Sequence, residues 1–131
     1  MGEINMVAVV AATLAFFVVG AVWYGALFGK PWQRETGITK PPQGAQVAKI
    51  MGLTLAFEML VVLMLDHTIA RTGASGHVIL MIATGFGLSI MTPAIGINYL
   101  HQRKSLTLFL IDAGHFVVGM AAAGLVLLAL R

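Results

Sequence analysis

Three ionisable side chains stand inside long apolar stretches of this chain. Glu58 lies near the middle of the apolar run 47–70, and Asp112 and His115 lie about two turns into the run 106–130. Asp112 and His115 are three residues apart, a spacing that puts both on one face of a helix. A carboxylate and an imidazole together can relay protons, because imidazole titrates near neutral pH. The residue types therefore predict one polar site inside the membrane, at which Glu58, Asp112 and His115 converge.

Two other interpretations of these side chains stay open at this point. Buried acids and histidines can be purely structural, since hydrogen bonds between them hold membrane helices together. The same groups could also bind a metal ion, although two carboxylates and one imidazole make an incomplete shell for zinc or manganese. No HxxxH or ExxH helix pair completes that shell. The sequence therefore allows these side chains to have a structural role, to form a proton or solute pathway, or to bind a metal ion.

The elements that must position these residues are four apolar runs joined by three short polar connections. The runs cover residues 4–28, 47–70, 78–99 and 106–130. A helix of roughly 20 apolar residues crosses the roughly 30 Å hydrocarbon core of a bilayer. Only 10% of the 131 residues are charged, whereas a soluble domain carries about 25%. The sequence predicts an all-α fold, a four-helix antiparallel transmembrane bundle that forms a single domain over residues 1–131.

The distribution of basic residues predicts how the bundle is oriented. Six of the eight lie in or beside the first and third connections, namely Lys30, Arg34, Lys40, Lys49, Arg103 and Lys104. The other side holds Arg71 and Arg131 alone. The positive-inside rule then places the first and third connections in the cytoplasm and both termini outside. All four Trp and Tyr residues fall near the same face. We therefore expect Trp23, Tyr24, Lys30, Trp32, Arg103 and Lys104 to be interfacial anchors.

Small residues predict where helices approach one another. Gly25 and Gly29 form a GxxxG pair at the end of the first run, and Gly119 is followed by Ala123 four residues later. Such pairs let helix backbones come close, so we expect Gly25, Gly29 and Gly119 to be packing positions. The same faces predict self-association, with a homodimer favoured. Pro93 is expected to kink the third run, since proline has no N–H to donate.

The remaining features exclude several classes of function. The chain has no cysteine, and no nucleophile elbow, HExxH or phosphate-binding glycine loop is present, so an enzyme is not favoured and no cofactor is expected. The net charge of +3 is spread over the connections, which gives no patch for nucleic acid. Asp66, His67 and His77 lie near the outer ends of their runs and are expected to be solvated. A cation site formed by these three residues is a weaker alternative.

Two stretches of the chain resemble a known family. The first is Gly20-Ala-Val-Trp-Tyr-Gly25 with Leu27-Phe-Gly-Lys-Pro-Trp32, and the second is Leu110-Ile-Asp-Ala-Gly-His115 with Gly119-Met120. They look like the small bacterial membrane proteins of domain-of-unknown-function family 1761. The resemblance implies four spans, a similar length and a location in the bacterial inner membrane. It implies no activity, substrate or cofactor.

The sequence as a whole predicts a small integral membrane protein whose partner is the lipid bilayer. Its intramembrane acids and histidine favour a proton- or cation-coupled transporter or channel-like protein, for a small solute or ion that the residues do not identify. The alternative is a non-catalytic structural or accessory subunit that self-associates or binds another membrane protein. A membrane-embedded enzyme with a lipid-soluble substrate is the least favoured interpretation.

Overall fold

The chain folds into helices alone throughout the part that the structure, a computed structural model, describes, which is residues 2–131. The elements in order are α1 (Met6–Val22), the π-helical η1 (Trp23–Leu27), α2 (Gly29–Thr36), α3 (Ala45–Thr72), α4 (His77–Gly85), the π-helical η2 (Phe86–Met91), α5 (Thr92–Gln102) and α6 (Leu106–Leu130). Four continuous rods are long and apolar enough to cross a membrane: Met6–Leu27, Ala45–Thr72, His77–Gln102 and Leu106–Leu130. The predicted all-α class and its four membrane-spanning helices are confirmed.

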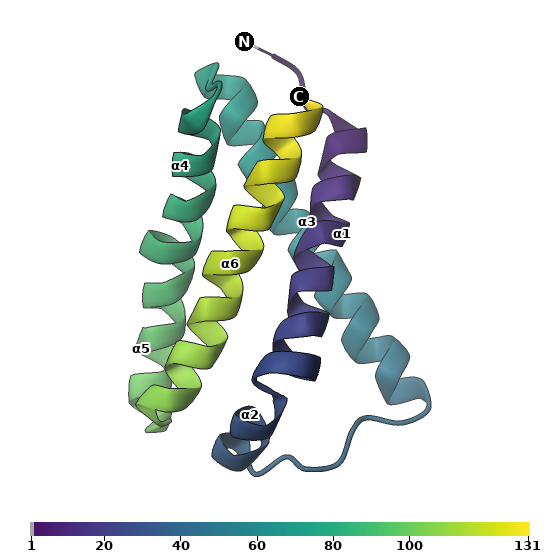
Figure 1. Ribbon diagram of the computed structural model, residues 1–131, viewed down its shortest axis with the longest axis vertical. Helices are drawn as coiled ribbons and strands as arrows, with labels where there is room; N and C mark the ends of the chain where they lie inside the picture. The colour runs from purple at the N-terminus through teal and green to yellow at the C-terminus, as the bar shows by residue number, and fades with distance from the viewer. Residues whose placement is uncertain (1) are drawn as a thin grey trace.

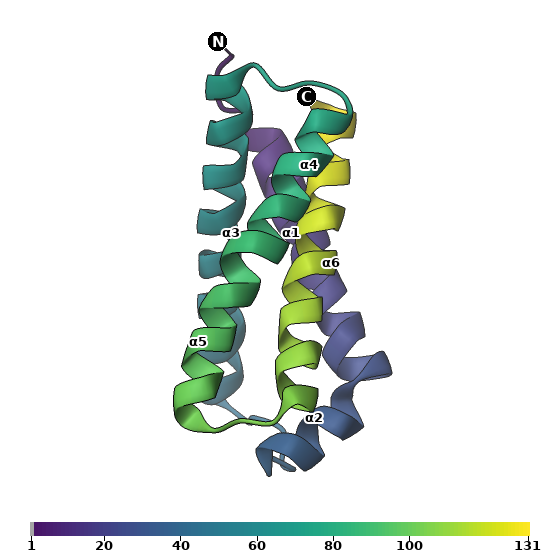
Figure 2. The same ribbon diagram turned by 90° about the vertical axis from the view of Figure 1, so that its left-hand side faces the viewer.

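The four rods run up and down between two ends of the molecule (Figure 1). Both termini and the α3–α4 turn lie at one end, which we call the terminal end. The short helix α2 and the α5–α6 turn lie at the other, which we call the loop end. Helix α6 packs against α1 on one side and against α4 and η2 on the other, as the view in Figure 2 also shows. Every other rod therefore takes its position from α6 or α1.

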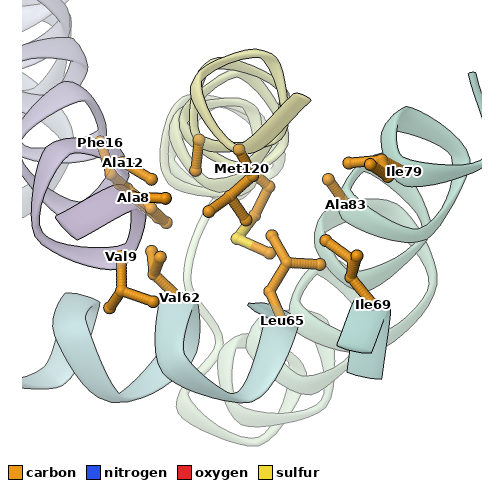
Figure 3. Close-up of a cluster of buried hydrophobic side chains, with 12 residues drawn as sticks. Ala8, Val9, Ala12, Phe16, Val62, Leu65, Ile69, Ile79, Ala83 and Met120 are labelled. Atoms are coloured by element: carbon orange, nitrogen blue, oxygen red, sulfur yellow. The ribbon is translucent and has the colours of Figure 1, made fainter. Parts of the chain in front are cut away.

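The hydrophobic core fills the terminal half of the bundle. In Figure 3, Met120 reaches from α6 into the space between the α1, α3 and α4 side chains. Small residues let these helices approach closely: a Cβ added at Gly119 would lie 2.6 Å from the ring of Phe16. Because lipid tails are as apolar as the side chains, close packing of this kind, rather than burial from water, holds membrane helices together. The apolar side chains of the terminal half therefore form a closely packed core.

Helix α3 leaves the bundle towards the loop end. The second half of α3 lies against α1, and the first half diverges from the other three rods towards the loop end (Figure 1). From residue 45 to residue 57 every residue is exposed except Thr54, which is half-buried. This stretch includes large apolar side chains such as Ile50, Leu53 and Phe57. Glu58 follows directly, at the height where α3 rejoins the bundle.

The rod that contains Pro93 includes a π-helical turn. Because proline has no N–H, the carbonyl four residues earlier in a regular helix loses its donor. Here η2 ends two residues before Pro93, and the Thr92 hydroxyl donates to the Gly87 carbonyl at 2.8 Å. A π turn therefore lies directly before Pro93, at the place where the sequence predicts a kink. This turn brings Met91 to the middle of the bundle, beside the site described next.

Candidate functional site

A cavity of about 190 Å³ lies at mid-height, where α3 rejoins the bundle. Its walls are mostly apolar, and the polar groups on it are the side chains of Glu58, His115 and Thr54. The lining residues come from four elements: Phe16 of α1; Thr54, Phe57, Glu58 and Val61 of α3; Met91 of η2; and His115 and Phe116 of α6. Two of the three predicted site residues therefore line one cavity, although they belong to different helices.

Glu58 and His115 are buried and lack hydrogen-bond partners. Glu58 is 5% exposed and His115 is 6% exposed. Among the described residues, neither Oε2 of Glu58 nor Nε2 of His115 has a hydrogen-bond partner. Buried polar atoms are nearly always paired in folded proteins, because leaving one unpaired costs about 1–3 kcal/mol. Both atoms belong to side chains that line one cavity, which makes this cavity the candidate site for a polar guest.

The ring of His115 is held in place by its apolar and aromatic neighbours. Phe16 meets it edge-on with ring centroids 5.6 Å apart, and Phe116 lies at 4.7 Å. Its Nε2 atom lies against α1 at Gly20, where an added Cβ would be only 2.9 Å away. A glycine at position 20 therefore makes room for the imidazole. The α1–α6 contact fixes the ring without a hydrogen bond to Nε2.

Asp112 belongs to a separate network. Its Oδ1 accepts from the Tyr24 hydroxyl at 2.5 Å, and its Oδ2 accepts from the Tyr99 hydroxyl. One residue earlier, the Ile111 carbonyl accepts from the indole N–H of Trp23 at 2.8 Å. Asp112 does not line the cavity, and both of its oxygens are paired. The structure thus brings Glu58 and His115 together at the cavity and assigns Asp112 to fastening η1 and α5 onto α6.

The two tyrosines were not predicted as partners of Asp112. The sequence places them at the membrane interface, and in the structure both hydroxyls point at the same carboxylate on α6. Tyr24 also joins the two sites, since its ring meets that of His115 edge-on at 5.1 Å. The sequence gives only a weak indication of this pairing: these are the only two tyrosines of the chain, and both lie towards the same end as Asp112.

The other predicted anchors lie at the loop end. Lys30, Arg103 and Lys104 are exposed there, and Trp32 of α2 is half-buried with its ring 6.1 Å from that of Tyr24. Helix α2 is fastened by the Ser105 hydroxyl, which donates to Glu35 at 2.9 Å.

The expectation that Asp66 is solvated is wrong. Asp66 is fully buried and accepts from Arg131 Nε at 2.5 Å and from the backbone N–H of Asn5 at 2.9 Å. The ion pair joins α3 to the end of α6, and the amide joins it to the start of α1. His67 instead lines a wide, open hollow at the terminal end together with Glu3 and Arg71. The sequence could not indicate this pairing, because Arg131 is 65 residues away from Asp66 along the chain.

The three predicted packing glycines have different surroundings. Gly119 lies under Phe16, as described above. Gly25 is exposed, and an added Cβ would meet nothing within 4 Å. At Gly29 an added Cβ would lie 2.4 Å from the Tyr24 carbonyl oxygen, so this glycine serves the tight passage from η1 into α2. Gly25 and Gly29 therefore do not form a helix–helix contact within one chain.

A metal centre finds no support in the donor set. Within residues 2–131, no three histidine or acidic side chains are grouped closely enough to share an ion. The cavity itself offers one carboxylate and one imidazole among apolar walls. These donors are too few to replace the hydration shell of a divalent cation.

Comparisons with known proteins place the chain in a family without assigning it an activity. Neither the curated proteins nor the solved structures contain a match. The family model described as "Protein of unknown function (DUF1761)" matches residues 7–128, nearly the whole chain and both stretches that carry the resemblance. The chain therefore belongs to the DUF1761 family of proteins of unknown function.

Proposed function

We propose that this protein is a small proton- or cation-coupled membrane transport protein, and that Glu58 and His115 form its intramembrane site. The observation that carries the proposal is the pair of buried, unpartnered atoms, Glu58 Oε2 and His115 Nε2, on side chains that line one cavity. Ionisable groups inside membrane helices are costly, and in transport proteins they mark solute paths and proton relays. In this proposal Asp112 is a structural neighbour rather than part of the relay.

The cavity is placed suitably for such a role. It lies between a packed terminal half and a loop half from which α3 diverges, so one side is closed and the other is loosely covered. Phe57 at its edge is 65% exposed. A guest can therefore approach Glu58 past α3 without disturbing the core. The distribution of basic residues supports an orientation with the loop end in the cytoplasm and both termini outside the inner membrane.

The proposal is tested by infrared titration of the purified protein in lipid nanodiscs. Carboxyl-stretch spectra are recorded from about pH 4 to about pH 9 in H₂O and D₂O, a range that brackets ordinary carboxyl and imidazole titration. Glu58→Gln identifies the Glu58 band, and Glu35→Gln at the exposed loop end serves as the matched control. We expect the Glu58 band to titrate and to shift in D₂O. A Glu58 band that neither titrates nor exchanges would rule out a proton-responsive site.

One observation favours a second candidate, a non-catalytic accessory or self-associating subunit. The half of α3 from residue 45 to residue 57 has almost no protein against it, although its surface is broad and apolar. Lipid can cover this face, and so can another membrane protein or a second copy. A sealed Glu58 in the infrared titration would favour this candidate over transport.

A further inference from the structure

We propose that the cavity beside Glu58 binds a small lipophilic monoamine as its ammonium ion. This inference rests on the proposed role of the cavity as a solute site, and it specifies the class of solute. The ammonium group would lie against the Glu58 carboxylate, and the hydrocarbon part among the rings of Phe16, Phe57 and Phe116.

The charges around the cavity favour a cationic guest over an anionic one. Its wall carries one carboxylate and no lysine or arginine, so an anion would have no counter-charge. Glu58 lines the cavity with a buried carboxylate whose Oε2 has no hydrogen-bond donor among the described residues, so a guest that donates an N–H to this carboxylate would supply an interaction that it lacks. An ammonium ion provides both the donor and the charge.

The apolar walls favour an organic cation over an inorganic one. Three phenylalanine rings, a valine and a methionine make up most of the lining. A metal ion needs several oxygen or nitrogen ligands, whereas an organic ammonium needs one counter-charge and gains from aromatic faces by cation–π attraction. His115 contributes its aromatic ring to the same wall.

The size of the cavity limits the guest to a small molecule. Drug-sized ligands occupy pockets of about 300–1,000 Å³, and this cavity measures about 190 Å³. That volume equals roughly six water molecules at their liquid density. A single ring with a short aminoalkyl group fits this limit, and any longer tail would extend past Phe57 into lipid.

The test is ¹⁹F NMR titration of the protein in nanodiscs with 4-fluorobenzylamine at a pH where the amine is charged. The neutral probe 4-fluorobenzyl alcohol has nearly the same shape and is the matched ligand control. We expect saturable binding of the amine, no saturable binding of the alcohol, and amine binding that is at least about tenfold weaker in Glu58→Gln. Glu35→Gln should bind the amine as the unmodified protein does.

A second variant guards against a fold defect in Glu58→Gln. Phe57 is mostly exposed, so Phe57→Leu keeps an apolar side chain while removing the ring, and we expect it to weaken amine binding several-fold. Equal binding of amine and alcohol, or unchanged amine binding in both variants, would overturn the inference. If Glu58 titrates in the infrared experiment and the amine does not bind saturably, the amine assignment fails while the proton site stands. If Glu58 does not titrate, the transport proposal itself fails.

Discussion

At the scale of single residues, the buried polar groups of this protein divide into paired and unpaired ones. Asp112 has two phenol donors and Asp66 has a guanidinium and an amide, so both carboxylates are satisfied. Glu58 and His115 are as deeply buried, but each retains an unpartnered atom. The sequence separates these acids and His115 only by their depth in the apolar runs. Pairing in the structure is what separates groups that join helices from candidate binding groups.

The Asp112 network predicts the stability of two tyrosine variants. Tyr24→Phe and Tyr99→Phe each remove one interhelical hydrogen bond, and each should lower the free energy of unfolding by about 0.6 kcal/mol and at most about 1.7 kcal/mol. The double variant should cost more than the sum, because it leaves a buried carboxylate without its phenol donors. Unfolding in mixed micelles measures these differences.

Thr84→Val is the control for this series, since the Thr84 hydroxyl donates to the Leu80 carbonyl of its own helix at 2.7 Å. Tyrosine variants as stable as Thr84→Val would show that Asp112 does not hold η1, α5 and α6 together.

At the scale of elements, helix α6 organises the molecule and α3 is attached at one end. Helix α6 contacts α1, α4, η2 and α5, whereas α3 relies on α1, on the α3–α4 turn and on the Asp66–Arg131 ion pair. Apolar run lengths predicted the four rods well. Run lengths could not predict the divergence of α3, since all four runs are long and apolar enough to span a membrane and tertiary contacts decide which halves meet.

The Asp66–Arg131 pair predicts a strong effect of a substitution at the terminal end. Arg131→Ala leaves Asp66 fully buried without its cation, and breaking a buried pair costs about 3–5 kcal/mol. We expect a value near the lower limit, because Arg131 itself is partly exposed at 17%. Thermal unfolding in detergent measures the loss. Arg71→Ala removes an exposed arginine at the same end and should have little effect; equal losses in the two variants would contradict the assignment.

Substitutions at Gly119 and Gly25 should distinguish packing within one chain from packing between two chains. Gly119→Leu should destabilise the folded chain, since even a Cβ at this position would collide with Phe16. A Cβ at position 25 would meet nothing within 4 Å, so Gly25→Leu should leave stability nearly unchanged. If the proposed homodimer forms through the Gly25 face, Gly25→Leu alone should abolish cross-linking in detergent without unfolding the protein. Cross-linking that persists would exclude this face from a dimer.

At the scale of the whole molecule, the fold class could be predicted from the sequence and the site only in part. Length and apolarity define four spans, and three-residue spacing puts Asp112 and His115 on neighbouring positions of one helix. That spacing did not show that His115 lines the cavity while Asp112 is bonded to the tyrosines of η1 and α5. Which neighbour each side chain meets depends on how each helix is rotated about its own axis. That rotation cannot be predicted from the pattern of a helix that has apolar residues on all sides.

The orientation of the molecule gives a prediction that suits a chain without cysteine. Ser75→Cys lies in the α3–α4 turn at the terminal end, and Gln102→Cys lies beside the α5–α6 turn at the loop end; both positions are exposed. An impermeant maleimide should label Ser75→Cys in intact spheroplasts and Gln102→Cys only after lysis. The reverse pattern would place the termini in the cytoplasm and contradict the positive-inside assignment.

The exposed Phe57 at the edge of the Glu58 cavity has a consequence for how the occupancy of the cavity depends on the lipid solubility of a guest. A guest that enters past Phe57 comes from the bilayer, so occupancy follows its mole fraction in lipid rather than its aqueous concentration. Each added CH₂ favours transfer out of water by about 0.8 kcal/mol, which is about a fourfold gain in partitioning. Along a homologous series of amines, potency should therefore rise with lipid solubility even where the contacts made inside the cavity are the same.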